Sequence, residues 1–155
     1  NVQSTIYDAK QTVNGRDSNV PVFVTSGSLD YSRNDRILKY RTNVDIRQGS
    51  DRLTSASADV FMNEKNELLK TVTETNVVIT QPGRRATGDW MQYTAENDIA
   101  ILRGSPANVT DSTSGAVQGT EVTVYMKEKR FIGNGKTPKN PNGRIRTVYK
   151  TDPTQ

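Results

Sequence analysis

Few residues in this sequence could carry out chemistry, because it contains neither histidine nor cysteine. Their absence excludes disulfides, thiol nucleophiles, histidine-based triads and the usual zinc sites. Glu96 and Asp98 are spaced to lie on one face of an extended segment, a geometry that paired acid–base carboxylates use. They flank Asn97 between two expected strands, however, where acidic residues are common in turns. We therefore expect no catalytic residues, metal site or cofactor.

Basic runs and aromatic residues offer a second kind of contact. Arg84-Arg85 and Lys127–Arg130 stand beside turn residues, so they are either solvated hairpin ends or contacts to phosphates or lipid headgroups. Four aromatic residues could stack bases, as in an oligonucleotide-binding barrel: Tyr31, Trp90, Tyr93 and Tyr125. They lack a dense basic surround, which favours a role in covering the ends of a core. The net charge of +4 permits an anionic partner but does not select one.

The composition favours β-structure throughout. Val, Ile and Thr number 15, 8 and 19, against only 6 Leu. β-branched side chains suit a pleated surface and lose side-chain freedom in a helix. A length of 155 residues suits one domain, and the low apolar content predicts a thin core. The sequence has no run of about 18 apolar residues that would span a membrane as a helix.

Apolar and polar residues alternate with a period of two, which predicts about a dozen short strands separated by turns. The expected strands are Val20–Thr25, Ile37–Arg41, Val44–Gln48, Leu53–Met62, Leu68–Thr75, Asn76–Thr80, Thr87–Ala95, Ile99–Gly104, Ala107–Asp111, Ala116–Lys127, Arg130–Gly133 and Arg144–Lys150. Such a pattern is typical of a sandwich, a jelly roll or a barrel.

The alternation gathers apolar side chains on one face of these strands. They form either an ordinary closed core or a trough that stays open to a long hydrocarbon ligand. The candidate lipid-binding residues are Val44, Ile46, Ala58, Val60, Met62, Val77, Ile79, Ile99, Ile101, Val109, Val117, Val122, Val124 and Met126.

An internal repeat suggests how this face is built. The segment 60–66 returns as 124–130, and Tyr31 and Ile37 have counterparts at Tyr93 and Ile99. A single repeat of this kind cannot bury its apolar face alone, so the copies should stack and share one elongated core.

A series of short motifs carries a resemblance to a known family. The motifs are Arg85-Ala86-Thr87-Gly88-Asp89, Met91-Gln92-Tyr93, Ile99-Ala100-Ile101-Leu102-Arg103-Gly104, Ala107-Asn108-Val109, Val117-Gln118-Gly119, Val122-Thr123-Val124-Tyr125 and Gly143-Arg144-Ile145-Arg146-Thr147-Val148. In order and spacing they resemble the OstA-like or LptA-like family of periplasmic lipopolysaccharide-transport domains. Segments 44–49 and 53–59 look like the same unit one repeat earlier. The sequence departs from the family at Tyr40-Arg41-Thr42-Asn43-Val44, where a glycine is usual.

The resemblance implies an all-β jelly roll of two antiparallel sheets in a V shape, open along one seam. It implies a domain over 23–150, preceded by an N-terminal extension at 1–22 and followed by a tail at 151–155. The protein would be a non-enzymatic carrier or bridge that shields lipopolysaccharide acyl chains in the periplasm on the way to the outer membrane. A signal or anchor would then lie outside this sequence.

The implied partners are lipopolysaccharide or lipid A, with Arg84 and Arg85 as headgroup contacts. Further partners are a second copy or homologous jelly-roll domains, joined through edge strands; no nucleic acid is expected. Two alternatives stay open at this point, a nucleic-acid-binding β-barrel and a structural adhesion domain.

Overall fold

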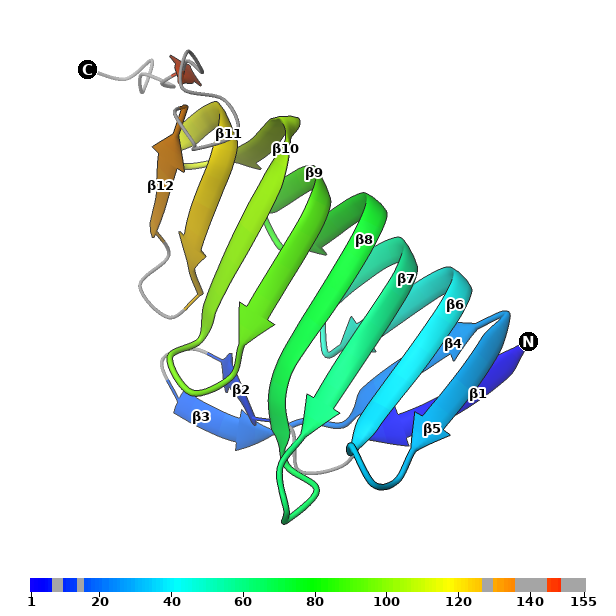
Figure 1. The fold of residues 1–155 in the computed structure, drawn as a ribbon. Helices are drawn as coiled ribbons and strands as arrows, with labels where there is room; N and C mark the ends of the chain where they lie inside the picture. The colour runs from blue at the N-terminus through cyan, green and yellow to red at the C-terminus, as the bar shows by residue number, and fades with distance from the viewer. Residues whose placement is uncertain (7–9, 14–15, 127–129, 136–144, 149–155) are drawn as a thin grey trace.

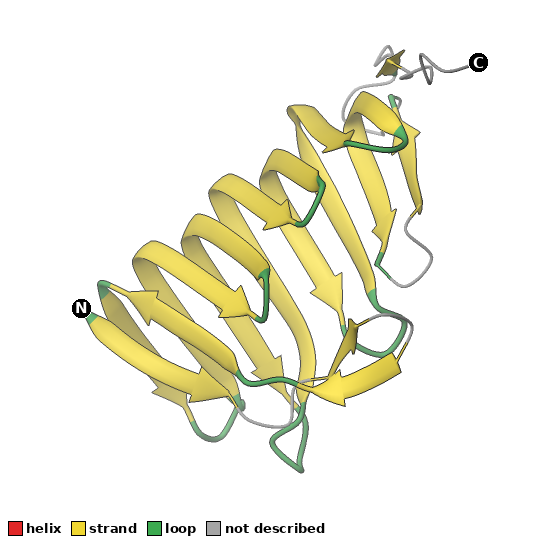
Figure 2. Ribbon diagram, turned by 180° about the vertical axis from the view of Figure 1, so that it is seen from behind, coloured by secondary structure: helices red, strands yellow, loops and turns green. Residues whose placement is uncertain are grey.

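The computed structural model describes residues 1–6, 10–13, 16–126, 130–135 and 145–148. These residues form strands, turns and loops, with no helix among them (Figures 1 and 2). The strands are β1 (Val2–Ile6), β2 (Lys10–Val13), β3 (Arg16–Asn19), β4 (Val22–Ser26), β5 (Ser28–Ser32), β6 (Ile37–Gln48), β7 (Asp51–Met62), β8 (Leu68–Gln81), β9 (Arg84–Thr94), β10 (Ile99–Asp111), β11 (Gly115–Tyr125), β12 (Arg130–Asn134) and β13 (Arg146–Val148).

Eleven of these strands form one antiparallel sheet in the order β1-β4-β6-β7-β8-β9-β10-β11-β12, with β5 also paired to β6 and β13 to β11. Strands β2 and β3 form a separate two-stranded sheet. The all-β antiparallel fold expected from the sequence is confirmed. The strands belong to one continuous open sheet, however, because the long central strands keep pairing with the same neighbours along their whole length.

The long strands are bent near their middles, as the curved ribbons in Figure 1 show. Thr42 and Asn43 in β6 have φ angles of 69° and 50°, and Thr75 and Asn76 in β8 have φ angles of 67° and 52°. These values lie in the left-handed region, where asparagine is tolerated better than most residues. Thr42 and Asn43 therefore adopt the conformation that the missing glycine of the family motif would favour.

The bends align across the sheet and divide it into two halves. The pairings of β6 with β7, β7 with β8, β8 with β9 and β10 with both neighbours all shift register at this line. We call the part that ends in the turns at 49–50, 82–83 and 112–114 the first half. The part that ends in the turns at 33–36, 64–66 and 95–98 is the second half.

The sequence predicts separate short strands on either side of three of these bends: 37–41 and 44–48, 68–75 and 76–80, and 99–104 and 107–111. The structure joins each pair into one strand, so these three predicted breaks are wrong. The residues that suggested a break are those that bend the strand instead. At the third bend, Ser105-Pro106 interrupts the pairing of β10, and its peptide bond is cis.

The core lies between the two halves and consists of two clusters. The cluster of the C-terminal strands contains Val77, Ala86, Met91, Ala100, Leu102, Ala107, Val109, Val117, Val122 and Val124. The cluster of the N-terminal strands contains Ile6, Val22, Val24, Tyr40, Val44, Ala58 and Val60. Each cluster takes residues from both halves, so burial of apolar surface holds the halves together.

Strand β1 belongs to this core although it lies within the expected N-terminal extension. It pairs with β4 along its whole length, and Ile6 is buried in the N-terminal cluster. The Ser4 and Tyr40 hydroxyls are hydrogen-bonded at 2.6 Å, so the buried phenolic oxygen of Tyr40 has a partner. Part of the expected strand at 144–150 lies outside the described residues, and the described part includes β13.

Candidate functional site

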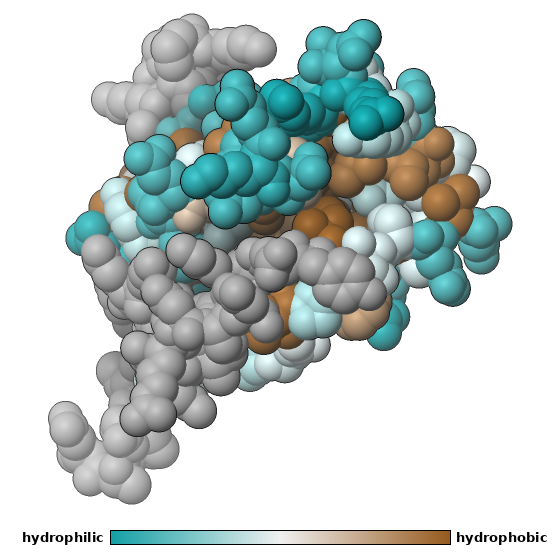
Figure 3. Space-filling view, turned by 90° about the horizontal axis from the view of Figure 1, so that it is seen from below, coloured by the Kyte–Doolittle hydropathy of each residue, from teal (hydrophilic) through white to brown (hydrophobic). Residues whose placement is uncertain are grey.

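A pocket of about 170 Å³ lies between the two halves of the sheet and between the two apolar clusters. Figure 3 shows hydrophobic side chains in the hollow, with hydrophilic side chains along its upper border in that view. The lining residues are Ile6, Val22, Val24, Ile46, Gln48, Asp51, Arg52, Leu53, Val60, Leu68, Thr71, Ile79, Gln81, Met91, Tyr93, Asp98, Ala100 and Met126.

The walls follow from strand pairing, because directly opposed residues in an antiparallel sheet point to the same face. In the first half, Leu53 of β7 pairs with Ile46 on one side and Ile79 on the other. In the second half, Thr71 of β8 pairs with Val60 and Tyr93. Each wall is thus a row of side chains that crosses several strands, and most of the lining is apolar.

Polar side chains gather at the mouth of the pocket. In the first half, the Gln81 amide donates to Asp51 at 3.2 Å. In the second half, the Tyr93 hydroxyl donates to the Asp98 carboxylate. Burial, the bond to Asp98 and the negative charges of Asp98 and Asp51 raise the pKa of Tyr93 above its usual value. Tyr93 therefore remains a protonated donor at neutral pH, and the charge of Asp51 acts on it across the mouth.

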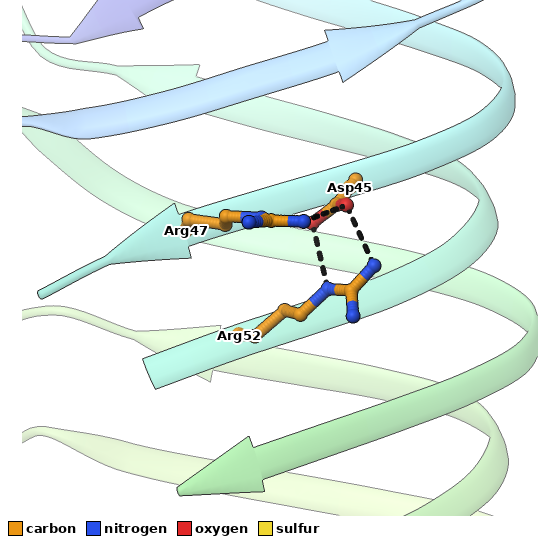
Figure 4. A network of polar contacts seen from close by, with 3 residues as sticks. All are labelled: Asp45, Arg47 and Arg52. Carbon is orange, nitrogen blue, oxygen red and sulfur yellow. Dashed lines mark hydrogen bonds and ion pairs between the residues drawn. The ribbon is translucent and has the colours of Figure 1, made fainter. Parts of the chain in front are cut away.

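Outside this mouth, two arginines share one carboxylate (Figure 4). Arg47 and Arg52 each donate two hydrogen bonds to Asp45, at 2.9 to 3.2 Å. Burial alone would raise the pKa of Asp45, but the bonds and charges of Arg52 and Arg47 hold it below its usual value. Arg52 is also among the residues that line the pocket, together with the acidic residues Asp51 and Asp98.

Of the fourteen candidate lipid-binding residues, four line the pocket: Ile46, Val60, Ile79 and Met126. Eight others belong to the clusters or pack against them without lining the pocket: Val44, Ala58, Met62, Val77, Val109, Val117, Val122 and Val124. Val124, for example, is only 3% exposed. The expected inner face is therefore partly closed core and partly open pocket.

The predicted orientation of the remaining two, Ile99 and Ile101, is wrong. Their neighbours Ala100 and Leu102 are buried in the C-terminal cluster, so the isoleucines point to the opposite face of β10. The cause is the register of β10, which places Leu102 opposite Val122 and Met91. Both alternating sets on this strand are apolar, so periodicity alone could not choose between them.

The two candidate headgroup residues lie on opposite faces of β9. Arg84 is buried, and its guanidinium donates to Asp111 at 3.3 Å. Arg85 is exposed and points away from the core. The structure therefore does not bring the two side chains together, and Arg84 is already held in an internal ion pair.

Several pocket residues were missed by sequence reasoning. Ile6 lies in the expected N-terminal extension, and Val22 lies in the expected strand Val20–Thr25 but was not among the candidate lipid-binding residues. Leu53 is out of phase with the even-numbered apolar residues later in β7, because the register shifts between Thr54 and Ser57. Ala100 lies between Ile99 and Ile101, the pair that the alternation favoured, and Met91 belonged to none of the expected apolar pairs. Their position on the inner face can be predicted once the register is known, because each is paired with another residue of that face.

The residues considered for other chemistry are not grouped in the structure. Glu96 is exposed in a turn, whereas Asp98 is engaged by Tyr93. Within the described residues no group of three or more acidic side chains could hold a metal ion. Trp90 and Tyr125 lie under the guanidiniums of Arg103 and Arg130, while Tyr93 faces the pocket. They do not form one platform for stacked bases.

Lys127, Glu128 and Lys129 of the second basic run lie outside the described residues. In the described part of the chain, no helix is long and apolar enough to cross a membrane.

The fold and the pocket define an all-β protein with an apolar interior that opens between the two halves of a bent sheet. A family model described as LptA/(LptD N-terminal domain) LPS transport protein matches residues 23–130, which is more than half of the chain. The chain belongs to this family, which confirms the resemblance seen in the sequence and the expected function in lipopolysaccharide transport.

A solved structure supports the fold. It is the crystal structure of LptH, described as the LptA homologous periplasmic component of the conserved lipopolysaccharide transport device from Pseudomonas aeruginosa. The two structures match with a TM-score of 0.74 over 85% of this chain and 96% of that one, at 18% sequence identity. No curated protein matches the sequence.

Proposed function

We propose that this protein carries lipopolysaccharide in the periplasm by binding part of an acyl chain of the lipid in the pocket between the two halves of its sheet. The observation that carries the proposal is an apolar hollow with polar residues at its mouth. An amphiphile fits this arrangement, with its chain inside and its headgroup at the rim. The family assignment and the likeness to LptH, a periplasmic component of lipopolysaccharide transport, support this ligand and this compartment.

The free energy gained by burying an acyl chain suits a lipid carrier. Removing a methylene group from water contributes about 0.8 kcal/mol, so apolar walls bind a chain without specific polar contacts. The pocket is smaller than the roughly 300–1,000 Å³ of sites that enclose a drug-sized ligand. It therefore holds part of a large amphiphile at a time, and the rest lies at the mouth. Arg85 and the Arg47–Arg52 pair are the proposed headgroup contacts.

The proposal includes the finer shape and the assembly expected from the sequence. The two halves of the bent sheet would act as the two leaves of a V-shaped jelly roll, with the mouth as its open seam. Strand β1 ends the described sheet on one side, and β12 and β13 lie at the other. Edge strands present backbone groups to a further strand, so homologous domains could continue the trough end to end.

Titration of fluorescent lipid A tests the proposal, using two substitutions on β8. Ile79 lines the pocket, whereas Val78 points to the opposite face. We expect Ile79→Asn to weaken binding about tenfold, because the chain would strip water from an unpaired amide. Val78→Asn should leave binding unchanged. Absence of saturable binding to the folded wild type, or equal binding by both variants, would contradict the proposal.

A further inference from the structure

The two halves of the sheet differ on their outer faces, which point away from the pocket. In the first half, the outer positions of the central strands carry mainly threonine, arginine and amide side chains, such as Thr54, Thr80 and Arg85. In the second half, many outer positions carry apolar or aromatic side chains. We call the following set, placed by cross-strand pairing, the outer apolar face: Ile37, Phe61, Val72, Trp90, Ile99, Ile101, Tyr125 and Ile132.

This face is accessible in the described part of the chain. The second half is turned toward the viewer in Figure 1, and no described strand lies in front of it. Ile132 is 50% exposed, and the other members of the outer apolar face are partly exposed. An antiparallel sheet with one buried face usually carries polar residues on the other. A continuous apolar surface in that position marks an interaction site. Ile99 and Ile101, which sequence periodicity placed inside, belong to this surface.

Each aromatic ring of the outer apolar face has a cation directly opposite it on the neighbouring strand. The pairs are Lys70 with Phe61, Arg103 with Trp90 and Arg130 with Tyr125, at 4.1 to 4.7 Å from the charged group to the ring centroid. Tryptophan, tyrosine and arginine are enriched at the centres of protein–protein interfaces and contribute much of their binding energy. The composition of the face therefore favours a protein as its partner.

The charged residues at the outer positions of the second half are nearly balanced in sign. They are Asp30, Lys39, Arg41, Asp59, Lys70, Glu74, Arg103, Glu121 and Arg130. Two of the carboxylates are paired within the face, Asp59 with Arg41 and Glu121 with Arg103. An anionic lipid surface would be repelled by several carboxylates here. A surface that carries both signs can instead be complementary to itself, which favours a second copy of this chain.

Lys70 and Glu74 indicate how two copies fit together. They lie on the outer face of β8, about 13 Å apart along the strand, with Val72 midway between them. A two-fold axis that crosses the strands at Val72 places Lys70 of each copy opposite Glu74 of the other. Ile101 lies at the same level, because Gln92 pairs with both Val72 and Ile101. The same axis therefore packs Val72 and Ile101 against their counterparts at the centre of the contact.

We propose that the outer apolar face binds the same face of a second copy, with the two sheets packed back to back about this axis. Full coverage of the eight strands β5 to β12 buries roughly 1,300 Å² in total, from a strand spacing of about 4.8 Å and about five residues per strand. That area is at the lower end of the roughly 1,200–2,000 Å² of specific protein contacts, so we expect a dissociation constant of about 10–100 µM. The contact closes at two copies, unlike pairing through edge strands, because each copy uses the same surface.

Sedimentation equilibrium of the full protein with charge-reversal variants tests this proposal. Lys70→Glu and Glu74→Lys should each weaken pairing about tenfold, because like charges then face each other twice across the axis. The double variant exchanges the two charges and should return the dissociation constant to within about threefold of the wild type. Ile101→Ser should also weaken pairing, since it removes apolar surface at the centre of the contact. Pairing through edge strands involves none of these side chains and should be the same in every variant.

Thr80→Glu is the matched control, because Thr80 is exposed on the outer face of the same strand but in the first half. Its dissociation constant should equal that of the wild type, and melting curves check that each variant is folded. A wild type that forms no dimer up to about millimolar concentration, or a double variant that pairs no better than the single ones, overturns the proposal. A monomeric wild type that cosediments with phosphatidylglycerol vesicles, and loses this on Ile101→Ser, assigns the face to a lipid surface and overturns it as well.

Discussion

The ion pair of Arg84 with Asp111 shows how a residue typical of the surface can become structural. The sequence Arg84-Arg85 beside a turn predicts solvent or headgroup contact for both residues. Burial of Arg84 could not be read from the sequence, because its partner lies 27 residues away on β10. Burial would raise the pKa of Asp111, but backbone N–H groups of Ser114 and Thr113 and the Arg84 guanidinium hold it below its usual value.

Asp111→Asn should therefore destabilise the protein in a pH-dependent way. At pH 7 the change leaves Arg84 buried without its counter-charge, and we expect a loss of about 2 kcal/mol in the free energy of unfolding. Because the folded pKa of Asp111 is lowered, its stabilising contribution is present above about pH 4 and is lost as pH falls through the folded pKa. The difference in free energy of unfolding between the wild type and Asp111→Asn should therefore shrink as the pH falls below about 4.

Urea unfolding at pH 7 and at about pH 3 measures this effect. Asp59→Asn is the control, because the ion pair of Asp59 with Arg41 is exposed and contributes little. A loss for Asp111→Asn that is the same at both pH values would show that the charge of Asp111 is not the cause.

At the scale of the strands, the sequence predicted where the backbone changes direction but not what it does there. Thr42-Asn43 and Thr75-Asn76 have low strand propensity at the second residue, so each pair looked like a break between strands. The structure bends each strand at that point and keeps it in the sheet. Hydrogen bonds from neighbouring strands on both sides of the bend supply that continuity, and no local pattern encodes them.

Asn76 offers a test of the bend itself. Its φ angle of 52° is left-handed, which is easy for glycine, tolerated by asparagine and costly for a β-branched residue. We expect Asn76→Val to lower the free energy of unfolding by about 1–2 kcal/mol, although Asn76 is exposed and loses no packing. Asn76→Gly should cost less than half as much. Denaturant unfolding of the two variants measures the difference, and equal stabilities would mean that the backbone at Asn76 is not constrained.

Across the whole molecule, the internal repeat predicted one elongated core shared by its copies, whereas the structure has two apolar clusters, with Val60 of the first copy in one and Val124 of the second copy in the other. The repeated alternation indicated one elongated apolar face, and both clusters do combine residues of both halves. The repeat could not distinguish closed core at Val124 from open pocket at Ile79. That difference depends on how closely the two halves of the sheet approach each other at each strand. The bends in the strands and the size of the side chains packed between the halves determine this distance.

The same architecture leads to a prediction about assembly. The described sheet ends with β1 on one side and with β12 and β13 on the other, so a strand of one copy could pair with the opposite edge of the next. Such a contact joins two different surfaces and repeats from copy to copy, which gives chains of variable length. We expect the average mass of the full protein in sedimentation equilibrium to rise with concentration.

Removal of all residues after Gly143 deletes β13 and uncovers the edge formed by Ala116, Val117 and Gln118. We expect this truncation to weaken association, because the new edge no longer presents the strand with which the next copy pairs. The melting temperature should change by only a few degrees, since β11 keeps its pairing with β10. Removal of residues 149–155 alone retains β13 and is the matched control, with association like that of the full protein. A full-length protein that stays monomeric up to about millimolar concentration, or a truncated one that associates equally well, would rule out pairing through this edge.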